Sequence, residues 1–207
     1  MGFTRDELLA FRDCTVDDLI GDDCRLLFVG INPGLWTAAT GAHFARPGNR
    51  FYPALYHAGI TESLIDASTG MSPRDRDQLV RRGIGITNVV ARATAAAAEL
   101  TADELREGGR RLVATVERIA PIVVAVAGIT AYRTAFGEPR ARPGRQSTVL
   151  GDAADTQVWV VPNPSGLNAH ETVETLASPY RAVAQAAGVE LVARDVPGAG
   201  SADPVRA

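Results

Sequence analysis

The sequence predicts a single α/β domain of three layers, with helices on both sides of a central, mainly parallel sheet. At 207 residues and 46% hydrophobic content, the chain is long enough to bury a sizeable core. Short apolar runs alternate with segments of helical periodicity, and no internal repeat is visible. This alternation is typical of parallel strands joined by crossover helices. We expect the domain to span residues 1–194 and the tail at 195–207, rich in Gly, Pro, Ala and Ser, to be disordered.

The first half of the chain contains two predicted strands, at about residues 25–31 and 84–90. Thr4 and Glu7 form a capping-box pattern that predicts a short helix over 4–13. Two further helices are expected, one that begins at Asn49 and holds Phe51, Pro53, Leu55 and Tyr56, and one that runs from Ser72 and Pro73 to Gly83.

The segment between the first strand and Asn49 is expected to be a long loop, because Leu35, Trp36 and Thr37 do not begin an obvious helix. It is rich in aromatic, His and Arg residues. A long loop of this composition is more often functional than idle.

The second half of the chain repeats the alternation of helices and strands. Thr101 and Glu104 form a second capping box, which predicts a helix to about Ile119. Continuous apolar runs predict strands at 122–126 and 158–161, helices are expected at 128–136 and 171–187, and residues 139–144 form a surface loop with arginines.

Two loops with similar sequences follow predicted strands: GINPG at residues 30–34 and NPSGLN at 163–168. Gly30 and Gly34 permit close approach by a ligand, and Pro33 stiffens the turn. Asn32 is the only side chain of the first loop with both a donor and an acceptor. Because ligands of open α/β sheets bind beyond the carboxyl ends of the strands, we expect both loops to form one site.

Composition excludes several functional classes. The chain has no lysine, so side-chain Schiff-base chemistry and a phosphate-loop lysine are unavailable. Two cysteines are too few for a disulfide framework, a structural zinc site or a four-thiolate cluster, and we expect no metal and no cofactor. A net charge of −3 argues against a broadly basic surface but allows a local patch. Without a membrane span or a signal peptide, the protein is expected to be cytoplasmic and without a membrane partner.

One interpretation of GINPG is a phosphate-cradling turn in a nucleotide-binding module. The pattern fits this poorly, because the third glycine of the dinucleotide fingerprint and the lysine of a P-loop are both missing.

Taken together, GINPG, GAHFARPGNRF at 41–51, ITNVV followed by Arg92, and NPSGLN resemble the mismatch-specific uracil-DNA glycosylases and thymine-DNA glycosylases. The similarity in order and spacing covers about residues 25–187. It implies a uracil-DNA glycosylase-like fold and an enzyme that flips uracil, mispaired with guanine, out of duplex DNA and hydrolyses its N-glycosidic bond. Thymine and etheno-cytosine are further candidate bases, and a monomer is expected.

The resemblance also assigns residues to the base pocket. Asn32 would orient the attacking water, since its amide cannot titrate, and Asn88 would lie near that water. Phe44 would stack on the flipped base, and Asn163 would hydrogen-bond to it without charge. The remaining expected pocket residues are Gly30, Ile31, Pro33, Thr37 and His43.

A second group of residues would contact the DNA. Gly166, Leu167 and Asn168 match the wedge that fills the gap left by the flipped base. Ser165, Arg46 and Arg50 are candidates for phosphate contacts. The family's bacterial members often carry Ser or Arg after the wedge leucine, where this chain has Asn168 and Ala169.

Three consequences can be tested. Thr37 is expected to crowd the methyl group of thymine, so that uracil is removed ahead of thymine. The absence of lysine predicts a monofunctional enzyme that leaves an intact abasic site. The absence of a catalytic carboxylate leaves open a non-catalytic reader that flips and holds a damaged base.

Overall fold

The computed structural model describes residues 2–194, and the predicted tail lies outside them. Its centre is a five-stranded sheet in the order β2-β1-β3-β5-β4. The parallel strands are β1 (Leu26–Gly30), β2 (Ile84–Asn88), β3 (Val123–Ala127) and β5 (Gln157–Val161). The short strand β4 (Gly144–Arg145) pairs antiparallel with β5 at the edge, in the segment expected to be a loop. The predicted mainly parallel sheet is confirmed.

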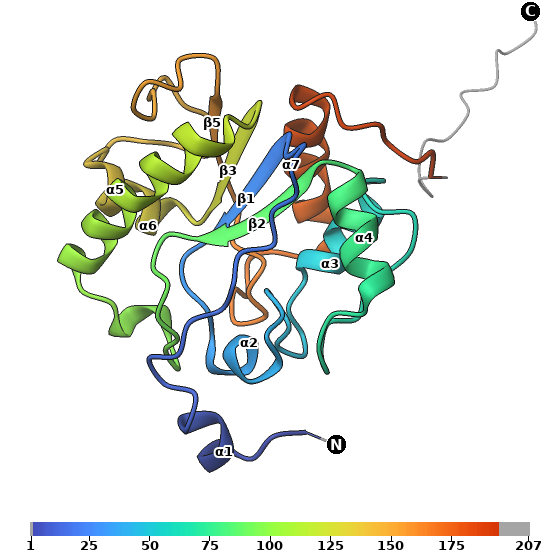
Figure 1. Ribbon diagram of the computed structural model, residues 1–207, viewed down its shortest axis with the longest axis vertical. Coiled ribbons are helices and arrows are strands. Elements are labelled where there is room, and N and C mark those ends of the chain that lie inside the picture. The colour runs from blue at the N-terminus through green and yellow to red at the C-terminus, as the bar shows by residue number, and fades with distance from the viewer. Residues whose placement is uncertain (1, 195–207) are drawn as a thin grey trace, which may run out of the picture.

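Helices cover both faces of the sheet (Figure 1). One face carries α5 (Ala102–Ile119) and α6 (Ile129–Phe136), and the other carries α3 (Phe51–His57), α4 (Pro73–Arg81) and α7 (Val173–Ala186). Side chains alternate along β1, so that Leu26 and Phe28 belong to one hydrophobic cluster and Leu27 and Val29 to the other. The three-layer architecture is therefore confirmed.

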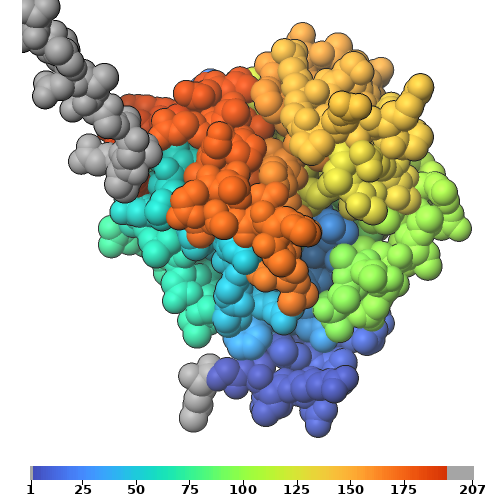
Figure 2. Space-filling model, turned by 180° about the vertical axis from the view of Figure 1, so that it is seen from behind, coloured from blue at the N-terminus to red at the C-terminus, as the bar shows by residue number. Residues whose placement is uncertain are grey.

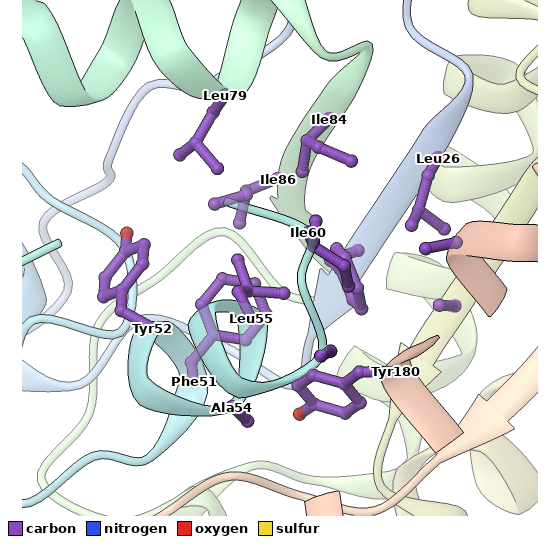
Figure 3. Packing of buried hydrophobic residues seen from close by; sticks show 14 of the residues in the cluster. Leu26, Phe51, Tyr52, Ala54, Leu55, Ile60, Leu79, Ile84, Ile86 and Tyr180 are labelled. Carbon is purple, nitrogen blue, oxygen red and sulfur yellow. The ribbon is translucent and has the colours of Figure 1, made fainter. Parts of the chain in front are cut away.

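The larger cluster fills the space between the sheet and α3, α4 and α7. Figure 3 shows Ile84 and Ile86 of β2 close to Leu79 of α4 and to Leu55 of α3. Phe28 and Phe51 meet edge to face with ring centroids 5.1 Å apart, and Tyr180 of α7 contacts both rings. Burial of these large side chains fixes α3, whose first residues follow the segment at 41–50.

Three helix starts predicted from capping patterns agree with the structure, whereas α3 begins at Phe51 rather than at the predicted Asn49. The side chains of Thr4, Ser72 and Thr101 each accept a hydrogen bond from the backbone N–H three residues later. Gly83 follows α4 with a φ of +69°, in the left-handed region that favours glycine. The first helix, α1 (Arg5–Leu9), is shorter than the expected 4–13.

The segment after β1 is not the continuous loop that the sequence predicts, because it contains helix α2 (Leu35–Thr40). No side chain caps its N-terminus at Gly34. Tertiary contacts hold it instead: Leu35 and Thr37 are buried, and Trp36 Nε1 donates to the Ser68 carbonyl at 2.8 Å. Across residues 2–194, every helix is too short or too polar to cross a membrane.

Candidate active site

A pocket of about 150 Å³ opens at the carboxyl ends of the parallel strands, where the two glycine-rich loops meet. Figure 2 shows this face, with the loop around residue 167 in orange and the segment after β2 in green on either side of the hollow. The predicted residues that line the pocket are Gly30, Ile31, Asn32, Pro33, Thr37, His43, Phe44, Arg46, Asn88, Asn163, Ser165 and Leu167. Residues of both loops therefore line one pocket.

The amide of Asn32 is held in one orientation. The two hydrogens of its Nδ2 are shared among three acceptors: the carbonyl oxygens of Pro33 at 3.0 Å and Arg92 at 3.1 Å, and Thr94 Oγ1 at 2.7 Å. Carbonyl oxygens only accept. The Thr94 hydroxyl donates its hydrogen to the Ala96 carbonyl at 2.9 Å, so toward Asn32 it can only accept. Nδ2 must therefore face these groups, which leaves Asn32 Oδ1 as an acceptor.

The backbone that holds Asn32 is itself anchored. Arg92 pairs with Glu104 at the start of α5 and with Asp13 at 2.9 Å. The hydrogen bond from Arg92 lowers the pKa of Glu104 to about 2, so this carboxylate is ionised at neutral pH. Ala93 exchanges backbone hydrogen bonds with Asp13 and Cys14. These bonds tie the N-terminal segment to the segment that follows β2.

Asn163 presents its amide nitrogen, whereas Asn32 presents its amide oxygen. Its Oδ1 accepts from the backbone N–H of Ser165 at 3.0 Å. An N–H can only donate, so the oxygen must lie on that side and Asn163 Nδ2 is left as a donor. Asn168 Nδ2 donates to the Asn163 carbonyl at 3.2 Å and closes the loop behind it.

His43 orients a third amide, that of Asn88 at the end of β2. His43 is 3% exposed, and burial lowers the pKa of its imidazole, so the ring is neutral at pH 7. His43 Nε2 lies 3.0 Å from the Asp17 carbonyl, which requires the proton on Nε2 and leaves Nδ1 as an acceptor. Asn88 Nδ2 lies 3.3 Å from that Nδ1 and donates to it.

The oxygen of Asn88 therefore points away from His43. A Cβ built on Gly30 would lie 2.5 Å from Asn88 Oδ1 and 3.4 Å from Phe44 Cζ. Only glycine lets these two side chains sit directly over the end of β1.

Phe44 is held in an uncommon conformation. Its φ is +55°, and its ring stacks on Phe51 with centroids 4.0 Å apart. Tyr52 donates from its hydroxyl to the His43 carbonyl at 2.8 Å, which fixes the preceding residue. The core thus positions an aromatic ring in the wall of the pocket, while α2 supplies the buried Thr37 on another side.

The second loop projects an apolar side chain. Leu167 is 72% exposed, although it lines the pocket mouth. Gly166 packs against the backbone of Gly48, since a Cβ there would lie 2.5 Å from the Gly48 carbonyl oxygen. Arg50 Nη1 donates to the carbonyls of Ser165 and Asn168, both at 3.1 Å, and so braces the loop. A phosphate contact by Arg50 or Arg46 stays a prediction.

The sequence did not single out every residue of the pocket. Thr94, Asn49 and the alanines at 95–97 also line it. The available signal for Thr94 was a hydroxyl shortly after Asn88, the last residue of β2, but the Asn32 amide that it contacts is 62 residues away. No lining residue of the described pocket is Asp or Glu, and residues 2–194 contain no cluster of three or more His, Cys, Asp or Glu suited to a metal.

Comparison with known proteins gives a family and a fold. The model of the Uracil DNA glycosylase superfamily matches residues 18–185. A solution NMR structure of a candidate uracil DNA glycosylase from Methanosarcina acetivorans aligns with a TM-score of 0.55 at 16% identity, over 82% of this chain and 96% of that one. At this identity the likeness concerns the fold.

Proposed function

The chain belongs to the uracil DNA glycosylase superfamily, and we propose that within it the protein is a mismatch-specific uracil-DNA glycosylase. It flips a uracil opposite guanine out of duplex DNA and hydrolyses the bond between the base and C1′ of the sugar. The proposal rests on the sequence motifs of the two loops and on one observation above all: the pocket presents amide groups whose orientations are fixed by the protein.

The fixed oxygen of Asn32 suits the attack of water. Asn32 Oδ1 accepts a hydrogen bond from a water and aims that water's lone pair at C1′, while Thr94 and the Arg92 carbonyl hold the amide still. An amide cannot remove a proton, so the water becomes nucleophilic only after the sugar has gained positive charge.

The two other amides match the edge of uracil. This edge has an N–H donor between two carbonyl acceptors, and the pocket offers Asn88 Oδ1 as acceptor and Asn163 Nδ2 as donor. The ring of Phe44 supplies a stacking surface. A pocket of about 150 Å³ suits a single base rather than a dinucleotide, since clefts for larger ligands have roughly 300–1,000 Å³.

The bond changes balance without a cofactor. The C1′–N1 bond breaks with its electron pair on the base, the water oxygen bonds to C1′, and the water proton passes to the departing base or to solvent. Stabilisation of the leaving base comes from the neutral donor of Asn163, which is weaker than a charged one. We therefore expect slow catalysis, and because the chain has no lysine we expect an intact abasic product.

The exposed Leu167 supports action on duplex DNA. A glycine loop that projects an apolar side chain next to the pocket can fill the gap in the stack, and its main-chain groups can pair with the widowed guanine. Ser165 lies between Asn163 and Leu167, where its hydroxyl can reach a phosphate.

A single-turnover assay tests the proposal. Enzyme in excess is mixed with end-labelled duplexes that carry G·U, A·U or G·T, and alkali then cleaves at abasic sites. We expect G·U to be cut fastest and Asn32→Ala to lose at least about 100-fold in rate, with thermal melting to show that the variant is folded. Selective binding of G·U without cleavage would support a reader of damaged bases instead, and tight binding of a mononucleotide without DNA binding would support a nucleotide-binding module.

A further inference from the structure

An acidic protein that binds a polyanion needs its positive charge concentrated where the polyanion lies. The net charge of this chain is −3, so its surface as a whole does not attract DNA. The sequence EPRARPGR at 138–145 is a strong local exception, and the exposed side chains of Arg140, Arg142 and Arg145 lie within it. We name residues 139–145, which include the short strand β4, the arginine loop.

The fold places the arginine loop at the pocket edge of the sheet. Strand β4 runs antiparallel to β5, with Gly144 opposite Val160. The residues just before Gly144 therefore lie at the carboxyl end of β5, where Asn163 and the second glycine-rich loop begin. Pro143 lines a second hollow together with Asn163 and Asn168. Figure 2 shows the yellow and gold segment that contains this loop on the same face as the pocket.

The backbone of the arginine loop is fixed by hydrogen bonds. Arg133 of α6 donates from Nε and Nη2 to the Ala141 carbonyl, at 3.0 and 2.6 Å. Gln146 Nε2 donates to the carbonyls of Arg142 and Gly144, at 2.7 and 2.6 Å. The guanidinium groups thus project from an ordered support.

Arg140, Arg142 and Arg145 have no ionic partner among residues 2–194. Arg106 and Arg110 of α5, by contrast, pair with acidic residues of their own helix, Asp103 and Glu107. Glu171, whose carboxylate accepts from Thr175 Oγ1 at 2.7 Å, is the acidic residue among those that line the second hollow, and the salt bridges of residues 2–194 do not join it to these arginines.

We propose that the arginine loop binds the DNA backbone through Arg140 and Arg142 and extends the duplex-binding surface beyond the wedge loop. The inference rests on the proposed function, because DNA phosphates come near this rim only if a duplex places its base in the pocket and Leu167 in its stack. Guanidinium groups suit phosphate oxygens in both charge and geometry. The arginine loop then supplies affinity without reading sequence.

The salt dependence of binding tests the proposal. Arg140→Gln, Arg142→Gln and the double variant are compared with the parent by fluorescence anisotropy, on a duplex with a tetrahydrofuran abasic analogue opposite guanine, between 50 and 200 mM NaCl. Each lost phosphate contact makes the slope of log K against log salt shallower by about 0.9 and lowers affinity about fivefold to tenfold near 100 mM. The matched control is Arg106→Gln/Arg110→Gln, which removes the same charge from α5.

The outcomes are distinct. A shallower slope for the double arginine-loop variant, with the α5 control close to the parent, supports the proposal. Equal slopes in a parent that binds and cleaves G·U duplexes overturn the arginine-loop assignment and leave the proposed function standing. Equal losses in both double variants also overturn it, because they show a general charge effect. A parent that neither binds nor cleaves duplex DNA refutes the proposed function and this inference together.

Discussion

Thr94 provides a test of how the attacking water is positioned. Its hydroxyl accepts from Asn32 Nδ2 at 2.7 Å and donates to the Ala96 carbonyl at 2.9 Å, so it acts on the reaction through the amide. Thr94→Val keeps the shape of the side chain and puts a methyl group in place of the hydroxyl, so the bonds to Asn32 and to the Ala96 carbonyl are both lost. The Pro33 and Arg92 carbonyls still accept from Asn32, so the amide keeps part of its preference for the productive orientation.

The expected loss follows from one hydrogen bond. A neutral hydrogen bond contributes about 0.5–1.5 kcal/mol, which corresponds to about a 2- to 13-fold lower single-turnover rate on a G·U duplex. DNA affinity should change little, because Thr94 contributes to the position of the amide rather than to the DNA surface. Thr94→Ser keeps the hydroxyl and serves as the matched control, with a rate close to that of the parent.

A double-mutant cycle decides whether Thr94 acts through Asn32. If it does, Asn32→Ala/Thr94→Val should be no slower than Asn32→Ala alone, because the amide that Thr94 orients is already gone. Additive losses in the double variant would refute this reasoning and show that the hydroxyl acts on the substrate directly.

Three other predictions concern the pocket and the product. Thr37→Ser removes one methyl group from the pocket wall and should raise the ratio of G·T to G·U cleavage by about tenfold; an unchanged ratio in the single-turnover assay would show that Thr37 does not crowd the thymine methyl. Burial lowers the pKa of His43 from its ordinary 6.5, with Asp18 and Arg76 as the nearby charges, so below pH 6.5 the unfolded chain binds more protons than the folded one. Stability to denaturant should therefore fall as the pH drops below 6.5. The rate on G·U should fall only at still lower pH, where the folded ring gains a proton and its Nδ1 can no longer accept from Asn88. His43→Gln, which offers a donor and an acceptor that do not titrate, should lack both effects. Finally, borohydride should trap no side-chain adduct with DNA, and strands should break only after alkali. Because the chain has no lysine, any adduct that borohydride does trap would have to form at the terminal amine.

Much of the fold was predictable because its signals are local. Thr101 and Glu104 are three residues apart, and their reciprocal capping fixed the start of α5 at the expected place. The apolar runs that became β1 and β3 are buried on both faces, which requires the parallel, helix-covered sheet that their composition indicates. Helix α2 was missed because its stability comes from contacts such as that of Trp36 with Ser68, 32 residues away.

The composition of the candidate site was predictable to a similar degree, whereas its chemistry was not. An asparagine in a sequence is equally a donor and an acceptor, and only its partners decide which group it presents. Those partners are distant: Thr94 orients Asn32 from 62 residues away, and His43 orients Asn88 from 45 residues away. The tautomer of His43 depends in turn on the carbonyl of Asp17, outside the strands and glycine-rich loops. A pocket built from neutral amides therefore obtains its polarity from the surrounding fold, and substitutions at these outlying partners should change catalysis without touching the substrate.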